Sequence, residues 1–143
     1  MKNLIIKNIK EAINLSEDVL EILKYSHFSP TKEKLSKLAK KYHEDKDILP
    51  FASFYENKIL GIIVVQKIDN ASYEIIDIAV DNNYRKQGIA RSVCEWLIQK
   101  AKAQGAGKIY LETSACGRSL YQSLGFHEMR DYLKLDEDTV ALE

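Results

Sequence analysis

Two kinds of hydrophobic pattern divide the chain into predicted helices and predicted strands. In three segments, apolar residues recur at positions i, i+3, i+4 and i+7, the spacing of a helix that packs through one face. These segments cover residues 16–23, 31–42 and 87–104. Short runs rich in Ile, Val, Tyr and Phe indicate strands instead. The predicted strands cover residues 3–9, 51–55, 58–67, 73–80, 108–112 and, less sharply bounded, 126–135.

The order of these elements predicts an α/β fold built on a mixed sheet. Strands 51–55 and 58–67 are joined by the tight polar turn of Glu56 and Asn57, so they form an antiparallel hairpin. Within the second of them, residues 62–65 are continuously apolar, as in a strand covered on both faces. Helix 87–104 then connects strand 73–80 to strand 108–112, and such a crossover makes the two strands parallel. Residues 139–143 are expected to be a frayed tail.

Composition indicates one ordinary globular domain over residues 1–143. With 45% apolar and 29% charged residues, the chain can bury a core without disulfides or metal. A formal net charge of zero gives no indication of nucleic-acid or membrane binding, and no run approaches the roughly 18 apolar residues of a membrane span. The two cysteines, Cys94 and Cys116, lack metal-ligand spacing and are typical of reduced thiols in a cytoplasmic protein.

Residues 73–91 are the stretch that most clearly indicates a binding site. Strand 73–80 enters a polar turn at residues 81–84, and Arg85-Lys86-Gln87-Gly88 then opens the pattern of the following helix. A strand that feeds a helix through a short glycine-containing turn directs free backbone N–H groups at one point, and the helix dipole favours an anion there. The stretch has neither the Gly-x-Gly-x-x-Gly of dinucleotide-binding loops nor the Gly-Lys-Ser/Thr of P-loops, so it lacks the features of these better-known phosphate loops.

This loop matches a known family motif. The pattern Arg85-x-x-Gly88-x-Ala90 resembles the acyl-CoA pyrophosphate loop of the GNAT superfamily of N-acetyltransferases, which is Gln/Arg-x-x-Gly-x-Gly/Ala. The match departs from the family at Asn82, where proline is frequent, and at Lys86, where glycine is common. Neither change removes a backbone donor, so both are compatible with cofactor binding.

A second motif downstream is similar to the closing motif of the same family. Leu120-Tyr121 on a short helix is followed, after three residues, by Gly125-Phe126. Ser114 stands where the family often has Asn, which makes the acceptor side harder to assign. The two motifs and the order of elements cover about residues 55–135, which we expect to be the cofactor-binding core of a GNAT-like fold. That fold has a mostly antiparallel sheet, one parallel strand pair at the cofactor site and about four helices.

The resemblance implies how acetyl-CoA, the acyl donor, is held. Backbone groups of strand 73–80 pair with the pantetheine arm, which lies in a gap between two splayed strands, and the Val80 N–H polarises the acetyl carbonyl. Backbone amides of residues 87–91 hold the pyrophosphate, and Arg85 adds positive charge. The alternative for Arg85 is a solvated surface arginine. The residues implied in cofactor binding are Ile78, Ala79, Val80, Arg85, Lys86, Gln87, Gly88, Ile89, Ala90, Arg91, Ser114 and Tyr121.

The resemblance also implies a general acid. Tyr121 has a phenol whose ordinary pKa of about 10 keeps it protonated at pH 7, so it can donate a proton to a departing thiolate. The alternative is that Tyr121 only packs a short helix. Cys116 is more typical of a structural thiol than of a nucleophile, because the family transfers the acyl group directly. His27, His43 and His127 are isolated in the sequence and indicate surface or helix-end positions rather than a metal site.

The base is left open between two carboxylates and bulk water. Deprotonating an alkyl amine at pH 7 costs roughly 4–5 kcal/mol, so a nearby carboxylate is worthwhile. Glu74 and Asp77 both lie on strand 73–80, where ideal alternation places them on opposite faces unless a bulge changes the parity. We rank Glu74 slightly ahead, with Asp77 as the second candidate.

The sequence thus predicts an enzyme that transfers the acetyl group of acetyl-CoA to a primary amine of a small molecule by direct attack. Acetylation of a protein N-terminus or lysine is a related alternative. A non-catalytic CoA-binding module is an alternative of another class, which Tyr121 argues against because a pure binder needs no positioned acid. No metal, nucleic acid or membrane partner is indicated, and a homodimer is left open.

Overall fold

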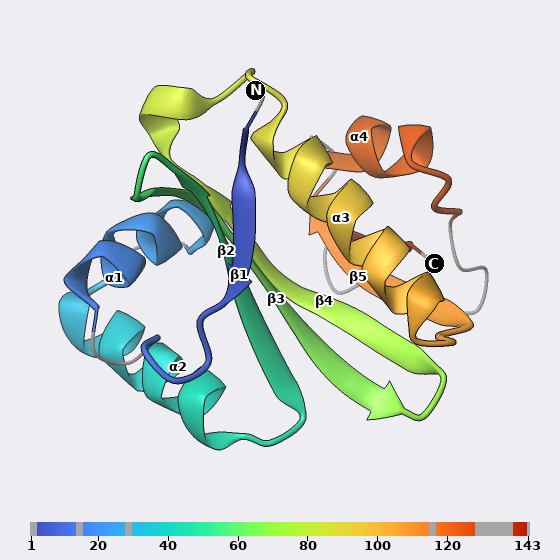
Figure 1. Cartoon of the computed structure of the whole chain (residues 1–143), viewed down its shortest axis with the longest axis horizontal. Helices are drawn as coiled ribbons and strands as arrows, with labels where there is room; N and C mark the ends of the chain where they lie inside the picture. The colour runs from blue at the N-terminus through green and yellow to red at the C-terminus, as the bar shows by residue number, and fades with distance from the viewer. Residues whose placement is uncertain (1–2, 14–15, 28–29, 115–116, 128–138, 143) are drawn as a thin grey trace.

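The chain folds around one mixed β-sheet (Figure 1), and the computed structural model describes residues 3–13, 16–27, 30–114, 117–127 and 139–142. Six strands lie in the sheet in sequence order. They are β1 (Ile5–Asn8), β2 (Ile48–Tyr55), β3 (Lys58–Asp69), β4 (Ser72–Val80), β5 (Lys108–Ser114) and β6 (Thr139–Leu142). Strands β4 and β5 are parallel and all other neighbours are antiparallel, which confirms the predicted mixed sheet.

Helices cover both faces of this sheet. Helices α1 (Glu17–Leu23) and α2 (Lys32–Glu44) lie on one face, and α3 (Ile89–Ala103) and α4 (Arg118–Ser123) lie on the other (Figure 1). Short 3₁₀ turns, η1 (Lys24–Ser26) and η2 (Asn82–Tyr84), follow α1 and β4. The hydroxyls of Ser16 and Thr31 accept hydrogen bonds from the backbone N–H groups three residues later, so both act as N-caps.

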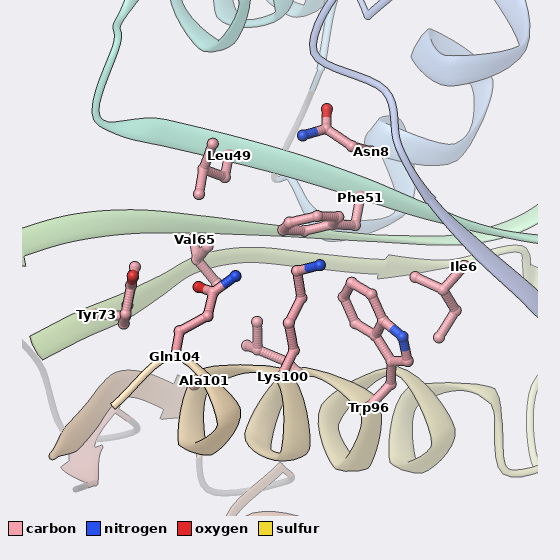
Figure 2. A pocket seen from close by; sticks show the side chains of 11 residues that line it. Ile6, Asn8, Leu49, Phe51, Val65, Tyr73, Trp96, Lys100, Ala101 and Gln104 are labelled. Carbon is pink, nitrogen blue, oxygen red and sulfur yellow. The ribbon is translucent and has the colours of Figure 1, made fainter. Parts of the chain in front are cut away.

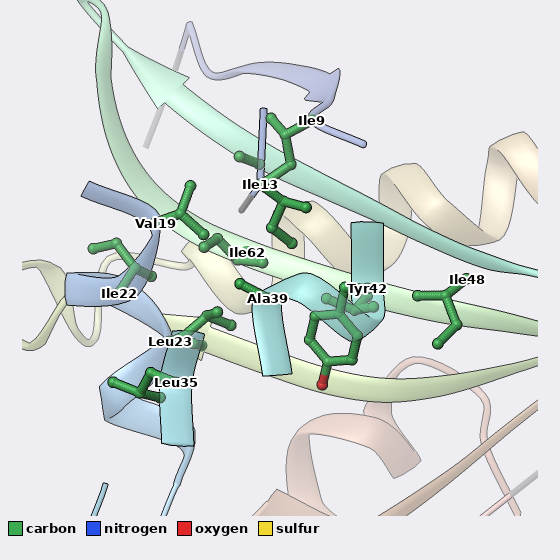
Figure 3. Close-up of a cluster of buried hydrophobic side chains, with 13 residues drawn as sticks. Ile9, Ile13, Val19, Ile22, Leu23, Leu35, Ala39, Tyr42, Ile48 and Ile62 are labelled. Carbon is green, nitrogen blue, oxygen red and sulfur yellow. The ribbon is translucent and has the colours of Figure 1, made fainter. Parts of the chain in front are cut away.

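The two faces carry separate hydrophobic cores. The core under α1 and α2 contains Ile13, Leu23 and Ile62 (Figure 3), and the core under α3 contains residues from the sheet and from the inner stripe of that helix. The continuous apolar run at residues 62–65 alternates between them: Ile62 and Val64 face one core, while Ile63 and Val65 face the other. This confirms that β3 is covered on both faces.

The C-terminal part differs from the prediction. Phe126 is buried but is not in a strand, and the rest of the strand predicted at 126–135 lies outside the described residues. The strand beside β5 is β6, so the expectation of a frayed tail is wrong for residues 139–142. Backbone pairing with β5 gives these residues hydrogen-bond partners that their side-chain pattern does not indicate.

The parallel strands β4 and β5 separate partway along their length. Their pairing begins at Ser72 and Lys108 and ends at Ile75 and Leu111. Beyond that point β4 continues to Val80 and β5 continues to Ser114, where it pairs only with β6. The last five residues of β4 therefore present a backbone edge that faces a gap rather than a neighbouring strand.

A half-buried lysine connects the beginning of the chain to the turn between α2 and β2. The ammonium of Lys10 donates hydrogen bonds to the carbonyl oxygens of Tyr42 at 2.7 Å and of Ile48 at 2.6 Å, and to that of Asp45. Two of these carbonyls belong to the C-terminal end of α2, where a cation also complements the helix dipole. Lys10 thus satisfies several backbone groups that have no partner within the helix.

Replacing Lys10 by Met should lower the free energy of unfolding by about 1–3 kcal/mol, because three partly buried carbonyls lose a charged donor. The matched control is Lys40→Met, which removes an exposed lysine whose ion pair with Glu44 spans 3.9 Å and should change stability by less than about 0.5 kcal/mol. Urea unfolding of the three proteins measures both values. Equal losses in the two variants would contradict this role of Lys10.

Candidate active site

A cavity of about 620 Å³ lies where the end of β4, the loop that follows it, the start of α3 and α4 come together. All residues predicted to bind the cofactor line this cavity except Gln87 and Ser114. The side chain of Ser114 lies outside the described residues. The lining also contains Tyr25, Tyr84, Gly117 and Leu120, which the sequence analysis did not assign to cofactor binding. We refer to this space as the cofactor cavity.

The loop before α3 has the geometry of an anion site. Lys86 and Gly88 both have left-handed backbone conformations, with φ of 64° and 79°. Gly88 begins α3, whose first helical hydrogen bond runs from Ser92 N to Gly88 O, so the amides of the first turn have no partner within the helix. A side chain at Gly88 would meet no atom within 4 Å, so the space in front of the loop is open.

Electrostatics of the same loop favour an anion. Arg85 and Lys86 line the cavity, and the first turn of α3 contains no acidic residue. Arg91 also lines the cavity, but its guanidinium donates to Ser123 Oγ at 2.5 Å and lies 3.7 Å from Glu95. We therefore expect Arg91 to contribute its backbone N–H rather than its charge.

A second cavity, of about 360 Å³, lies in the gap between β4 and β5. We refer to it as the acceptor cavity. Its lining includes Ser26, Asp77, Glu112 and Thr113, and it shares Ile78 and Tyr121 with the cofactor cavity. The two cavities therefore meet at Ile78 and Tyr121, beside the unpaired edge of β4.

Tyr121 is held at this junction by packing. Its ring contacts Phe126 edge-on, with centroids 6.0 Å apart, and burial, followed by the neighbouring thiol of Cys94, raises the pKa of its phenol. Gly117 permits this placement, because a side chain there would collide with Thr113 Oγ1 and contact the Tyr121 ring. A phenol with a raised pKa is fully protonated at neutral pH, as a proton donor must be.

A bulge in β4 changes the faces of the two predicted carboxylates. Val64 pairs with Asp77 while Val65 pairs with Ile75, which leaves Ile76 as the extra residue. Ile75 packs into the core under α3, and Asp77 instead contacts α2. Glu74 and Asp77 consequently lie on the same face of the sheet, which is the alternative to ideal alternation that the sequence analysis allowed for a bulge.

The environments of these carboxylates differ. Asp77 is only 7% exposed and lines the acceptor cavity. Glu74 is half-buried and is not among the described residues that line it. Burial, and then the charge of Glu112, raises the pKa of Glu74. Glu112 itself lines the acceptor cavity, and the sequence analysis did not consider it although it is the last residue of the predicted strand 108–112.

His27 is a second residue that the sequence analysis missed, because it read this histidine as a surface position. Its Nε2 lies 2.9 Å from Asp77 Oδ2, and its side chain is 33% exposed. The hydrogen bond with Asp77 raises the pKa of His27, and partial burial opposes that effect. No feature of the sequence indicates this pair, because the two residues are 50 positions apart.

Other features of the described residues do not form a comparable site. A groove of about 330 Å³ between α3 and the sheet contains Phe51 and Trp96, with ring centroids 4.9 Å apart, and the Lys100 ammonium over both rings (Figure 2). Its lining contains no carboxylate or thiol and none of the predicted site residues. The described residues include no cluster of metal-ligating side chains, and none of their helices is long and apolar enough to cross a membrane.

Comparisons with known proteins agree with this geometry. The Acetyltransferase (GNAT) family matches residues 16–126. The ribosomal protein bS18-alanine N-acetyltransferase of Escherichia coli K12 is 33% identical over 84 residues, which cover 56% of this chain and 55% of that protein. The chain spans about half the length of the curated relatives that it matches.

Solved structures give the same fold. The crystal structure of the ribosomal-protein-S18-alanine N-acetyltransferase from Escherichia coli aligns with a TM-score of 0.71 at 25% identity, over 98% of this chain and 90% of that one. A GNAT family acetyltransferase from Elizabethkingia anophelis with acetyl-CoA bound aligns with a TM-score of 0.74 at 23% identity, over 99% and 97% of the two chains.

The contact between His27 and Asp77 gives a testable pH dependence. In an NMR titration, His27 should titrate above 6.5, and Asp77→Asn should return its pKa toward that value. Because the folded-state pKa is raised, the pair stabilises the protein fully below about pH 6.5 and loses this effect as pH rises through the folded-state pKa. The stability difference between wild type and His27→Gln should therefore shrink from pH 6 to pH 9. A His27 titration unaffected by Asp77→Asn would contradict the pairing.

Proposed function

The chain belongs to the acetyltransferase (GNAT) family, and we propose that it transfers the acetyl group of acetyl-CoA to the primary amine of a small molecule. The observation that carries this proposal is the meeting of the two cavities at Ile78 and Tyr121. One cavity has a loop suited to a diphosphate and the other has carboxylates suited to an amine. A thioester at the junction would face both the acceptor and a proton donor.

In this proposal, main-chain groups provide most of the cofactor binding. The amides of Gly88, Ile89 and Ala90 hold the diphosphate, and Arg85 and Lys86 add positive charge. The unpaired edge of β4 from Ile78 to Val80 supplies backbone donors and acceptors to the amide groups of pantetheine, as a neighbouring strand would. The pocket lined by these residues is large enough for such a ligand.

The chemical step then requires one proton donor and one proton acceptor. The amine nitrogen attacks the thioester carbonyl carbon, the C–S bond breaks, and the Tyr121 phenol donates its proton to the sulfur. An N–H of β4 near Val80 stabilises the negative charge that develops on the carbonyl oxygen. The proton released by the amine goes to a carboxylate of the acceptor cavity.

We assign that proton acceptor to Glu112, with Glu74 as the second candidate. Glu112 lines the acceptor cavity, and burial, followed by the nearby charge of Glu112, raises the pKa of Glu74. Asp77 also lines the cavity, but hydrogen bonds from three side chains occupy its carboxylate. A base needs an accessible lone pair, and Asp77 has the fewest available.

Acetylation of a protein N-terminus is the second candidate function. It is favoured by the 33% identity to an enzyme named for the alanine of ribosomal protein bS18. A panel of small amines and of short peptides with N-terminal alanine, with detection of released thiol, separates the two candidates. Acetyl-CoA binding without thiol release for any acceptor would instead support a non-catalytic binding module.

Gly88→Glu should weaken acetyl-CoA binding at least about tenfold, because it places bulk and negative charge in front of the loop amides. Gly105→Glu is a matched control at the other end of α3, where φ is 82° and a side chain would also meet nothing within 4 Å. Both variants should lose about 1 kcal/mol of stability, but only Gly88→Glu should lose affinity in calorimetry. Unchanged affinity in folded Gly88→Glu would refute the loop assignment.

Tyr121→Phe should lower kcat by about 10²–10⁴-fold while acetyl-CoA affinity stays within about twofold, because the ring and its packing remain. Tyr110→Phe, a change of the same kind on β5, should leave kcat nearly unaltered. Steady-state kinetics with the best acceptor of the panel measures both effects. If kcat of Tyr121→Phe stayed within about threefold of wild type, Tyr121 would be a packing residue.

Glu112→Gln should lower kcat/KM steeply near pH 7, and the loss should shrink as pH approaches the amine pKa of about 10.4, since solvent then removes the proton. Glu74→Gln should show a smaller and flatter loss. Kinetics of both variants from pH 6.5 to pH 10 give the comparison. If only Glu74→Gln lost kcat/KM steeply near pH 7 and recovered it at high pH, Glu74 rather than Glu112 would be the base. Full activity in both variants would show that neither carboxylate is the base.

A further inference from the structure

Asp77 has an environment that the acetyl-transfer chemistry does not require. Its carboxylate is buried and accepts hydrogen bonds from Ser26 Oγ at 2.6 Å and from Tyr42 Oη at 2.9 Å, while His27 Nε2 lies 2.9 Å away. These contacts occupy both carboxylate oxygens: Ser26 is bound to Oδ1, and His27 and Tyr42 are bound to Oδ2. A buried anion with this many donors is typical of a fixed structural charge.

The donors join three separate parts of the fold. Tyr42 belongs to α2, whereas Ser26 ends the η1 turn and His27 follows it. Asp77 lies on β4 immediately after the bulge, so it connects β4 with α2 on one side and with η1 on the other. The bulge is what directs Asp77 toward these elements, because without it the side chain would face the core under α3.

The segment bound by Asp77 forms part of both cavities. Tyr25 lines the cofactor cavity and its neighbour Ser26 lines the acceptor cavity. Tyr25 and Ser26 therefore form one wall of the junction at which the two reactants meet, and His27 follows them directly. The position of this wall relative to β4 depends on the contacts of Ser26 and His27 with Asp77.

We propose that Asp77 is a positioning residue that fixes the segment 25–27 against β4 and thereby sets the width of the acceptor cavity. The role in acceptor selection rests on the proposed acetyltransferase function, but the anchoring of the segment does not. In this role Asp77 controls which amines reach the thioester and how tightly they bind. It does not take the amine proton, so its loss affects KM and acceptor range more than the maximal rate.

Neighbouring charged groups agree with a separation of roles. Glu112 on β5 lines the same cavity, and its charge acts on Glu74 of β4. Tyr121 faces the cavity from α4. The cavity thus has a proton donor on α4, Tyr121, and a carboxylate on β5, Glu112, in addition to Asp77. The proposed chemistry therefore does not need Asp77 as a catalytic group.

The first test measures the segment itself by amide hydrogen exchange. Asp77→Asn should speed exchange of the amides of residues 25–27 by about tenfold or more, because charge-assisted hydrogen bonds are lost. Amides of α3 should exchange as in wild type. Ser26→Ala removes one donor, His27→Ala removes the imidazole, and both leave Asp77 in place. They should give smaller increases and keep the test valid if Asp77→Asn does not fold. Unchanged exchange of residues 25–27 in all folded variants would overturn the proposal.

The second test compares kinetics at one pH with the best acceptor and with a bulkier amine of the same class. Asp77→Asn should raise KM for the best acceptor about tenfold or more and keep kcat within about fivefold of wild type. The ratio of kcat/KM for the best acceptor to kcat/KM for the bulkier amine should fall. Ser26→Ala should change KM in the same direction. A collapse of kcat in Asp77→Asn, with wild-type exchange of the segment, would show that Asp77 is a catalytic group instead.

The two tests also separate this proposal from the proposed function. If wild type releases no thiol with any acceptor, the acetyltransferase assignment fails, yet the exchange measurement still decides whether Asp77 fixes the segment. If wild type is active and the exchange is unchanged, the assignment stands and the positioning role fails.

Discussion

The site depends on one feature of the sheet, which is the loss of pairing between β4 and β5 beyond Ile75 and Leu111. Backbone N–H and C=O groups that lose a neighbouring strand need another partner. The unpaired edge of β4 therefore provides a row of donors and acceptors that a ligand with amide groups can satisfy. Both cavities open along this edge, and Tyr121 of α4 lies where they meet. The remaining elements hold the two strands apart and place charges around the gap.

Charge is divided between the two cavities. The described lining of the cofactor cavity contains Arg85, Lys86 and Arg91 and no acidic residue, whereas that of the acceptor cavity contains Asp77 and Glu112 and no lysine or arginine. An anionic diphosphate suits the first environment and a cationic amine suits the second. The zero net charge of the chain does not reveal this separation, because the separation is a property of two small surfaces and not of the overall composition.

The sequence predicted the elements that depend on local patterns. The spacing of apolar residues located α3 and the double-sided strand β3, and the loop from Arg85 to Ala90 was identified because its motif is continuous in sequence. The separation of β4 from β5 was implied only by the family resemblance, since both strands have the pattern of ordinary strands. A bulge in β4 was considered but could not be located from the sequence, and the bulge at Ile76 changes the face on which Asp77 lies. The contacts of Asp77 with His27 and Tyr42, and the position of Glu112, required tertiary structure because they join segments far apart in the chain.

A crystal structure of the complex with acetyl-CoA tests the central claim most directly. The diphosphate oxygens should lie about 2.7–3.2 Å from the amide nitrogens of the first turn of α3, and pantetheine should pair with the backbone of Ile78 and Val80 in the gap between β4 and β5. The thioester sulfur should face the hydroxyl of Tyr121. Binding of acetyl-CoA at another place, such as the groove beside Phe51 and Trp96, or closure of the gap by renewed pairing of β4 with β5, would contradict the account.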